Sequence, residues 1–223
     1  MKKLLKSNTF LFKLWFHLYR KNRGLKSSYF NKNTEFYLDG YPRSGNTFAV
    51  SLIKSIYGKE SIVHHLHAIA PIKIALKKNI PVFILVRDPK EAITSYYLKT
   101  YSLNHETIPK KINHILLKKL TIEYSNYYEF VIKNKFNLEI ILFKDLISNP
   151  LNFISKVNSK VYKDKWKLDS FQIDGLINDY SGAKDTFGSS KPNKEKEKLK
   201  KSLKDVLLEL EEYQNAIFTF NKY

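Results

Sequence analysis

The chain of 223 residues contains no cysteine. It can therefore form neither a disulfide nor a thiolate metal site, and a metal site would have to be built from histidines and carboxylates. The absence of cysteine is compatible with a reducing compartment, and we expect a cytoplasmic protein.

The sequence also lacks a long hydrophobic run. The most apolar stretch lies within residues 1–33, a basic and aromatic N-terminal extension, but Lys13, His17 and Arg20 interrupt it. A bilayer span needs roughly 20 apolar residues, so no transmembrane helix is predicted. No small-residue cleavage site marks a signal peptide either. We expect a helix packed on the domain; the alternative is a basic aromatic helix on the inner membrane face, a peripheral membrane contact.

Acidic residues are few: 21 Asp and Glu stand against 39 Lys and Arg, for a formal net charge of +18. Such a charge would ordinarily suggest nucleic acid or an anionic membrane. Lysine, asparagine and isoleucine are abundant throughout, however, and no nucleic-acid-binding motif accompanies them, so we expect no nucleic-acid partner. Anionic ligands still gain from the positive field. The chain is 43% apolar, which is enough for a full hydrophobic core. We expect residues 34–223 to form a single domain with a helical C-terminal part.

A glycine-containing loop at residues 40–46 separates a run of β-formers, Phe36 to Leu38, from the helical apolar spacing of residues 49–56. The spacing Gly40-x-x-x-x-Gly45, followed by Asn46 and Thr47, matches the outline of a P-loop, in which backbone N–H groups and a helix N-terminus receive an anion. Asn46 stands where a nucleotide P-loop has the lysine that reaches the outer phosphates. The loop therefore predicts a short nucleotide as ligand, the alternative being a structural βα turn.

The order of patterns along the chain predicts the fold. Strands are expected at residues 36–38, 61–64, 81–86 and 139–143, and helices at 49–56, 71–77, 89–99, about 110–135, near 150, near 170 and at 194–212, with a turn at 145–150. This alternation predicts an α/β, three-layer P-loop-type fold with a central, mostly parallel sheet of about four to five strands flanked by helices. The polar loop 179–193, with Lys184 and Lys191, is long for a connector and is a candidate lid.

Three histidines, His64, His65 and His67, lie at and just after the end of the second predicted strand. They would lie at the carboxyl edge of the sheet, where open α/β sheets bind ligands, and a histidine there can act as a general base. Neighbouring strand residues point to opposite faces and no further ligands are evident, so zinc is the weaker alternative. A hydrogen-bonded core histidine is the other.

Arg87 ends the third predicted strand, and a helix start follows at once, with Asp88 as N-cap, Pro89 at the first helical position and Glu91 three residues after Asp88. Arg87 and Ser95 are thereby fixed relative to each other, as two phosphate-binding groups need to be. The alternative is an arginine paired with Asp88.

The segments YPRSGNTF at 41–48 and VRDPKEAITSYY at 86–97 resemble the two nucleotide-binding motifs of PAPS-dependent sulfotransferases. The resemblance runs from about residue 36 to 150 and takes in ILFKDLISNP at 141–150. The resemblance implies that PAPS is the donor, that Arg87 and Ser95 hold its 3′-phosphate, and that Phe48, with Phe143 nearby, stacks on adenine. It further implies that the 5′ end is held by the loop residues Arg43, Ser44, Gly45, Asn46 and Thr47.

Two departures from the family pattern are visible. Many members have lysine in place of Arg43, and the glycine-rich basic motif expected near the C-terminus is absent unless the loop carrying Lys184 and Lys191 takes its place, with Lys191 as a donor-binding residue. The implied base is His65 or His67, and spacing slightly favours His65.

The implied reaction is in-line transfer of a sulfuryl group to a hydroxyl or amine of an acceptor, with Arg43 stabilising the leaving oxygen and no metal required. The acceptor stays open between a cell-envelope carbohydrate, a lipid and a small alcohol. Two other functions stay open: a P-loop phosphotransferase, and a basic membrane- or nucleic-acid-associated module without enzymatic activity.

Overall fold

A computed structural model describes residues 2–20, 29–57, 61–104, 111–164 and 194–223 of the chain. Lys184, Lys191, the candidate lid 179–193 and the helix expected near residue 170 lie outside the described residues. The N-terminal part contains α1 (Lys2–Ser7), α2 (Thr9–Trp15) and the π-helical turn η1 (Phe16–Arg20). The elements that follow are β1 (Phe36–Gly40), α3 (Asn46–Tyr57), β2 (Ile62–His64), α4 (Ile69–Lys77), β3 (Val82–Val86), α5 (Pro89–Asn104), α6 (His114–Lys133), η4 (Lys135–Asn137), β4 (Glu139–Leu142), α7 (Phe143–Ser148), α8 (Pro150–Val157), η5 (Asn158–Tyr162), α10 (Lys194–Glu209) and α11 (Glu211–Phe220).

The described strands form one parallel, four-stranded sheet in the order β2-β1-β3-β4. All five residues of β1 and all five of β3 are buried, as expected of central parallel strands covered on both faces. Side chains alternate between the faces: Tyr37 packs into one apolar cluster, while Phe36 and Leu38 pack into the other.

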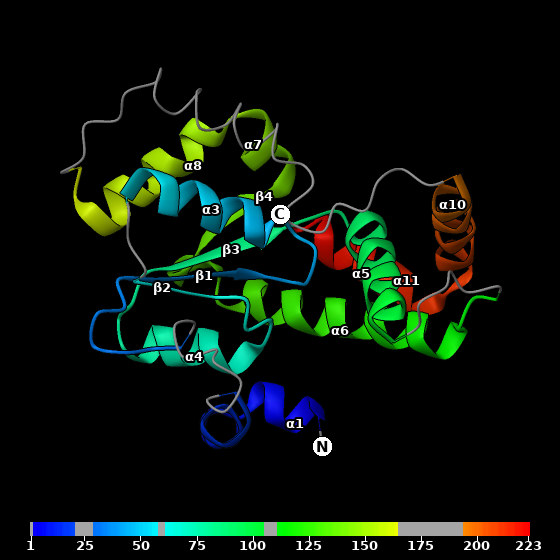
Figure 1. Cartoon of the computed structure of the whole chain (residues 1–223), viewed down its shortest axis with the longest axis horizontal. Coiled ribbons are helices and arrows are strands. Elements are labelled where there is room, and N and C mark those ends of the chain that lie inside the picture. The colour runs from blue at the N-terminus through cyan, green and yellow to red at the C-terminus, as the bar shows by residue number, and fades with distance from the viewer. Residues whose placement is uncertain (1, 21–28, 58–60, 105–110, 165–193) are drawn as a thin grey trace.

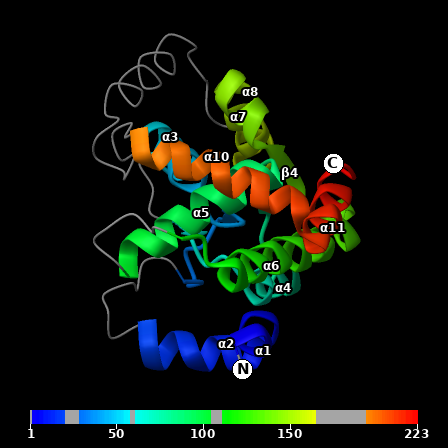
Figure 2. The same cartoon turned by 90° about the vertical axis from the view of Figure 1, so that its right-hand side faces the viewer.

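Helices cover both faces of the sheet (Figure 1). α3, α7 and α8 lie on one face, and α4 and α6 lie on the other. α10 packs on α5, and α11 runs beside α6 (Figure 2). The two C-terminal helices therefore pack against the rest of the domain. The predicted α/β, three-layer P-loop-type fold is therefore confirmed, with four parallel strands in the described part of the chain.

Two local predictions are wrong. The turn expected at residues 145–150 contains a short helix, α7, because Leu146 is buried against the sheet and the Asn149 side chain caps the following helix. The helix expected over 194–212 ends at Glu209, where Leu210 adopts an extended backbone, and a second helix continues to Phe220.

The N-terminal helices pack on the outer side of α4. Phe12 and Phe16, four residues apart, are 1% and 4% exposed and join the apolar cluster of that face. Phe10, Leu14 and Leu18 lie on the other side of the same helical stretch and stay exposed. Among the described helices, none is both long and apolar enough to cross a membrane.

Candidate functional site

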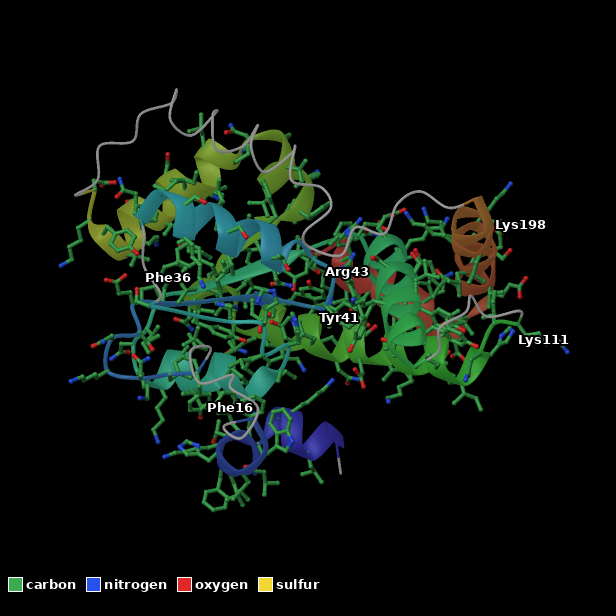
Figure 3. All side chains as sticks on the ribbon, in the orientation of Figure 1. Phe16, Phe36, Tyr41, Arg43, Lys111 and Lys198 are labelled. Atoms are coloured by element: carbon green, nitrogen blue, oxygen red, sulfur yellow. The ribbon has the colours of Figure 1, made fainter. Side chains whose placement is uncertain are left out.

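The site lies where the chain changes direction across the sheet. α3 connects β1 to β2 over one face, and α4 leads back to β3 over the other, so the strand order reverses between the carboxyl ends of the neighbouring strands β1 and β3. Open α/β sheets bind ligands at such a switch point. Tyr41 and Arg43 follow β1 at this end of the sheet, far from Phe36 at its start (Figure 3).

The loop after β1 is a tight turn that leads directly into α3. Gly45 has φ 92°, and a Cβ atom on it would lie 2.7 Å from the Phe143 ring, so glycine is required both by the backbone and by the close approach of that ring. Arg43 also has a left-handed backbone, with φ 71°. Such strain in a non-glycine residue gathers at functional sites.

A buried tyrosine of α6 holds this loop. The Tyr128 hydroxyl donates to the carbonyl of Leu85 (2.6 Å), accepts from the amide of Tyr41 (3.2 Å) and lies 3.1 Å from the Ser44 hydroxyl. Asn46 closes the turn from within, because its Nδ2 donates to the carbonyl of Tyr41 (3.3 Å). The Asn46 Oδ1 is buried and has no hydrogen-bond partner among the described residues, which leaves an acceptor at the N-terminus of α3.

Two arginines and a serine meet beside the loop. The Arg43 Nε donates to Ser95 Oγ of α5 (3.0 Å), and Arg87 Nη1 donates to the carbonyl of Arg43 (2.9 Å). The Arg87 guanidinium lies over the Phe143 ring, 4.4 Å from its centroid. Partial burial lowers the pKa of Arg87, while the carboxylate of Glu91 opposes the shift. The group stays cationic at neutral pH, so the cluster presents two positive charges.

The carboxylate that pairs with Arg87 is Glu91 (3.8 Å) rather than Asp88, the predicted alternative. Glu91 also pairs with Lys200 (3.3 Å) and with Lys204, both from α10. Burial alone would raise the pKa of Glu91, but its bonds to these lysines lower it overall. Lys200 and Lys204 offset the negative charge of Glu91, so the area around Arg87 keeps a net positive charge.

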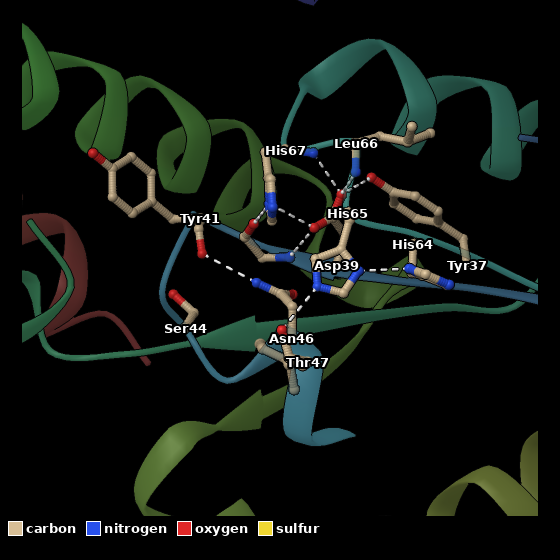
Figure 4. A network of polar contacts seen from close by, with 12 residues as sticks. Tyr37, Asp39, Tyr41, Ser44, Asn46, Thr47, His64, His65, Leu66 and His67 are labelled. Carbon is tan, nitrogen blue, oxygen red and sulfur yellow. Dashed lines mark hydrogen bonds and ion pairs between the residues drawn. The ribbon is translucent and has the colours of Figure 1, made fainter. Parts of the chain in front are cut away.

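His67 and Asp39 form a hydrogen-bonded pair on the other side of the loop (Figure 4). His67 Nδ1 is 2.9 Å from Asp39 Oδ1 and 2.8 Å from the carbonyl of Gly40. Both neighbours are acceptors, so Nδ1 carries a hydrogen, and in the neutral ring Nε2 is the basic nitrogen.

Asp39 is fully buried and accepts five hydrogen bonds, which also fix the chain between β2 and α4. Besides His67 Nδ1, its donors are the Tyr37 hydroxyl (2.7 Å) and the amides of Gly40 (2.9 Å), Leu66 (2.9 Å) and His67 (2.7 Å). Burial alone would raise the pKa of this carboxyl, but the charge and hydrogen bonds of His67, with those of Tyr37 and Gly40, lower it to about 2. Asp39 is therefore ionised across the physiological range.

His65 makes different contacts. Its Nε2 lies 3.2 Å from Thr47 Oγ1, at the start of α3, and its Nδ1 lies 2.5 Å from His64 Nδ1. Burial lowers the pKa of His64 to about 4, helped by the neighbouring His65 and Lys54, so His64 is neutral at pH 7. Both His65 and His67 have left-handed backbones, with φ 57° and 47°. The described part of the chain contains no group of three metal-ligating side chains.

Most of the predicted site residues come together in the structure. The loop carries Arg43, Ser44, Gly45, Asn46 and Thr47, and Arg87, Ser95, Phe143, His65 and His67 surround it. Phe48 is half-buried against the apolar cluster under α3, and Lys191 lies outside the described residues. Sequence reasoning missed Asp39 and Tyr128. A carboxylate inside an otherwise apolar central strand is a signal that could have identified Asp39.

No sequence-family profile matches the chain, and no curated protein sequence matches it. By fold and loop, the chain is a parallel α/β protein with a P-loop-type turn. Among solved structures it is similar to the mouse sulfotransferase SULT7A1 complexed with PAP, with a TM-score of 0.48 and 15% sequence identity over 70% of this chain. The match spans 66% of that protein's own length, slightly under two thirds.

Proposed function

We propose that the chain is a PAPS-dependent sulfotransferase that moves a sulfuryl group to an acceptor hydroxyl. The observation that carries the proposal is the meeting of a P-loop-type turn with the Arg43, Arg87 and Ser95 cluster at the switch point of the sheet. A nucleotide with phosphates at both its 3′ and 5′ positions needs two anion sites held at a fixed separation. The loop amides at the start of α3 supply one, and the arginine–serine cluster supplies the other.

In this proposal Arg87 and Ser95 bind the 3′-phosphate, and Phe143 lies close to adenine while it keeps the Arg87 guanidinium in place. Arg43 donates to Ser95, so it can serve the same phosphate or turn toward the leaving oxygen at the 5′ end. The two roles differ in kinetics: a binding role raises the KM for PAPS, and a role in transfer lowers kcat.

The reaction balances without a metal. The acceptor oxygen attacks sulfur and forms the new S–O bond, while the S–O bond to the 5′-phosphate breaks and its electron pair stays on the phosphate oxygen. The acceptor proton moves to a histidine and then to solvent. The products are the sulfate ester, 3′,5′-ADP and a proton. The loop amides and the N-terminus of α3 stabilise the charge that grows on the leaving oxygen.

We assign the base to His67 and an orienting role toward Thr47 to His65. His67 Nδ1 is held as a donor by Asp39 and Gly40, which directs the basic lone pair to Nε2 and stabilises the imidazolium that forms. The two ring nitrogens of His65 make other contacts: Nε2 lies within hydrogen-bond distance of the Thr47 hydroxyl, and Nδ1 lies close to His64 Nδ1. These contacts fit the orienting role assigned to His65.

A P-loop phosphotransferase is the second candidate, favoured only by the loop outline. Asn46 opposes it, because it stands in the position of the phosphate-reaching lysine and its 3% exposed side chain holds the turn closed. ATP binding tighter than 3′,5′-ADP binding would favour this candidate.

The test is thermal stabilisation by nucleotides. We expect 3′,5′-ADP to raise the Tm clearly more than AMP, because one charge-assisted phosphate contact contributes about 1.5–3 kcal/mol. Arg87→Ala removes most of the difference. Lys77→Ala, which removes one exposed charge from α4, is the matched control and keeps it. Equal shifts with the two nucleotides would contradict the proposal.

A further inference from the structure

A cavity of about 500 Å³ borders His67 and the loop, between α1, α6 and the chain that leads into α4. Its wall is mostly apolar, and His67 is part of its lining. The volume is within the usual range for small-molecule sites, about 300–1,000 Å³. A slightly larger cavity of about 560 Å³ lies at the amino ends of β3 and β4, the opposite edge of the sheet from the loop, and is remote from the site chemistry.

The spacing of residues on α6 accounts for this wall. Ile115, Lys118, Lys119, Ile122 and Asn126 follow one another at helical intervals along one side of α6 and line the cavity. The other side of α6 buries Leu117, Leu120, Tyr124 and Tyr128 in the core. Ile115 and Ile122 are 83% and 38% exposed, so the core does not explain these two apolar side chains. Pro42, Ala68, Ile69 and Tyr127 complete the apolar wall.

The rim of the cavity is cationic. Lys6 is paired with Glu123 across it (3.0 Å), and Lys118 is paired with Glu212 of α11 (2.5 Å). Lys119 makes no ion pair with any described residue. The rim therefore has a lysine charge available for an anionic group at the far end of a bound molecule.

We propose that this cavity binds the acceptor, and that the acceptor is a small alcohol or phenol with an apolar body and one anionic substituent. The inference rests on the proposed function, because it takes His67 as the base that receives the hydroxyl proton. A carbohydrate is disfavoured, since those of its hydroxyls that face Pro42, Ile69 and Ile122 would lose water without gaining hydrogen bonds. An apolar ring or chain loses nothing there and gains the burial of its surface.

The test measures binding rather than turnover, so that it does not depend on the reaction. The probe is 6-hydroxy-2-naphthoate, titrated by its fluorescence with and without saturating 3′,5′-ADP, and compared with 2-naphthol and methyl glucoside. We expect saturable binding in the order naphthoate, naphthol, glucoside. Ile122→Glu raises the Kd for both naphthols at least about tenfold, because it places a charge in the apolar wall. Lys119→Ala raises the Kd for the naphthoate by about three- to tenfold and that for 2-naphthol by less than twofold.

Two variants outside the cavity serve as matched controls. Leu208→Glu places the same charge on an exposed leucine of α10, and Lys201→Ala removes a lysine of the same helix; both leave the probe affinities unchanged. Absence of saturable binding, unchanged binding in Ile122→Glu, or a preference for the glucoside overturns the acceptor site. The 3′,5′-ADP shift is measured on the same variants. If 3′,5′-ADP gives the wild-type protein no larger thermal shift than AMP, the proposed function is refuted. If that larger shift is present but no probe binds, the acceptor site alone is refuted.

Discussion

Asp39 shows how one buried charge can organise a site. Its carboxylate joins the end of β1 to the segment after β2, through the amides of Leu66 and His67, and it also orients the His67 ring. An ionised carboxylate in an apolar core is tolerated only when its oxygens are fully hydrogen-bonded, as they are here. The residue therefore contributes to the fold and to the proposed chemistry through the same contacts.

The pH dependence of stability tests this role. The pKa of Asp39 is about 2 in the folded chain against 3.8 for an ordinary aspartate, so the stability it supplies is complete above about pH 4 and is lost as the pH falls toward 2. Asp39→Asn is less stable than wild type at pH 5. Its deficit narrows by about 1 kcal/mol between pH 5 and pH 3, because only the wild type loses this contribution there.

Urea unfolding at pH 5, 4 and 3 measures this deficit. Asp205→Asn, on the exposed side of α10, is the control, and its difference from wild type stays constant. A constant deficit for Asp39→Asn as well would mean that the folded carboxyl titrates normally.

The two histidines are separable by kinetics. We expect His67→Ala to lower single-turnover sulfuryl transfer by about 10²- to 10⁴-fold while the Kd for 3′,5′-ADP changes little, because a general base acts only on the acceptor proton. His65→Ala, whose ring contacts Thr47 of the loop, serves as the comparison and has the smaller effect on transfer. A larger loss in His65→Ala would reverse the two assignments.

At the scale of elements, the β1–α3 turn depends on Gly45. Gly45→Ala forces a side chain into a left-handed backbone with φ 92° and brings its Cβ within 2.7 Å of Phe143. We expect a loss of about 1–3 kcal/mol in the free energy of unfolding and a weaker affinity for 3′,5′-ADP, since the loop amides move.

The matched control is Ala49→Gly, one turn further along α3, which costs about 1–2 kcal/mol through helix propensity and the loss of a buried methyl group, and which leaves nucleotide affinity unchanged. Urea unfolding and calorimetric titration distinguish the two variants. Nucleotide affinity that survives Gly45→Ala would exclude the loop from binding.

The sequence patterns predicted the helices and strands better than they predicted the contacts between side chains. The run PVFILV and the segment EIILF are apolar enough to identify β3 and β4, and the glycine spacing identified the loop between β1 and α3. The pairing of Asp39 with His67 was not predictable, because it joins segments 28 residues apart through a left-handed turn at His65 and His67. The helix α7 was missed because six residues are too few to show helical periodicity, and the helix is stabilised by a tertiary contact, the packing of Phe143 and Leu146 near Gly45.

At the scale of the whole molecule, helices near both ends of the chain contribute contacts to the candidate site and its cavity. Lys200 and Lys204 of α10 neutralise Glu91 beside Arg87, and the Tyr223 hydroxyl donates to the Tyr128 carbonyl (3.0 Å) beneath the loop. At the other end, the N-terminal helices bury Phe12 and supply Lys6 to the cavity rim. The predicted peripheral membrane contact through residues 1–33 stays a prediction, and the exposed Phe10, Leu14 and Leu18 are the side chains that would make it.

The net charge of +18 allows a final discrimination between a selective nucleotide site and general polyanion binding. A contact between 3′,5′-ADP and a partly buried cluster is screened only in part, so we expect its affinity to fall by no more than about tenfold between 50 and 500 mM NaCl and its preference over AMP to persist. A surface that binds polyanions by counterion release would instead lose about 10³-fold or more over that range, without preference among nucleotides. Parallel titrations of 3′,5′-ADP, AMP and a single-stranded oligonucleotide at both salt concentrations measure this. If the preference for 3′,5′-ADP disappears at 500 mM NaCl while the oligonucleotide binds tightest at 50 mM, the charge of the surface rather than the Arg87 cluster governs binding, and the proposed donor site is wrong.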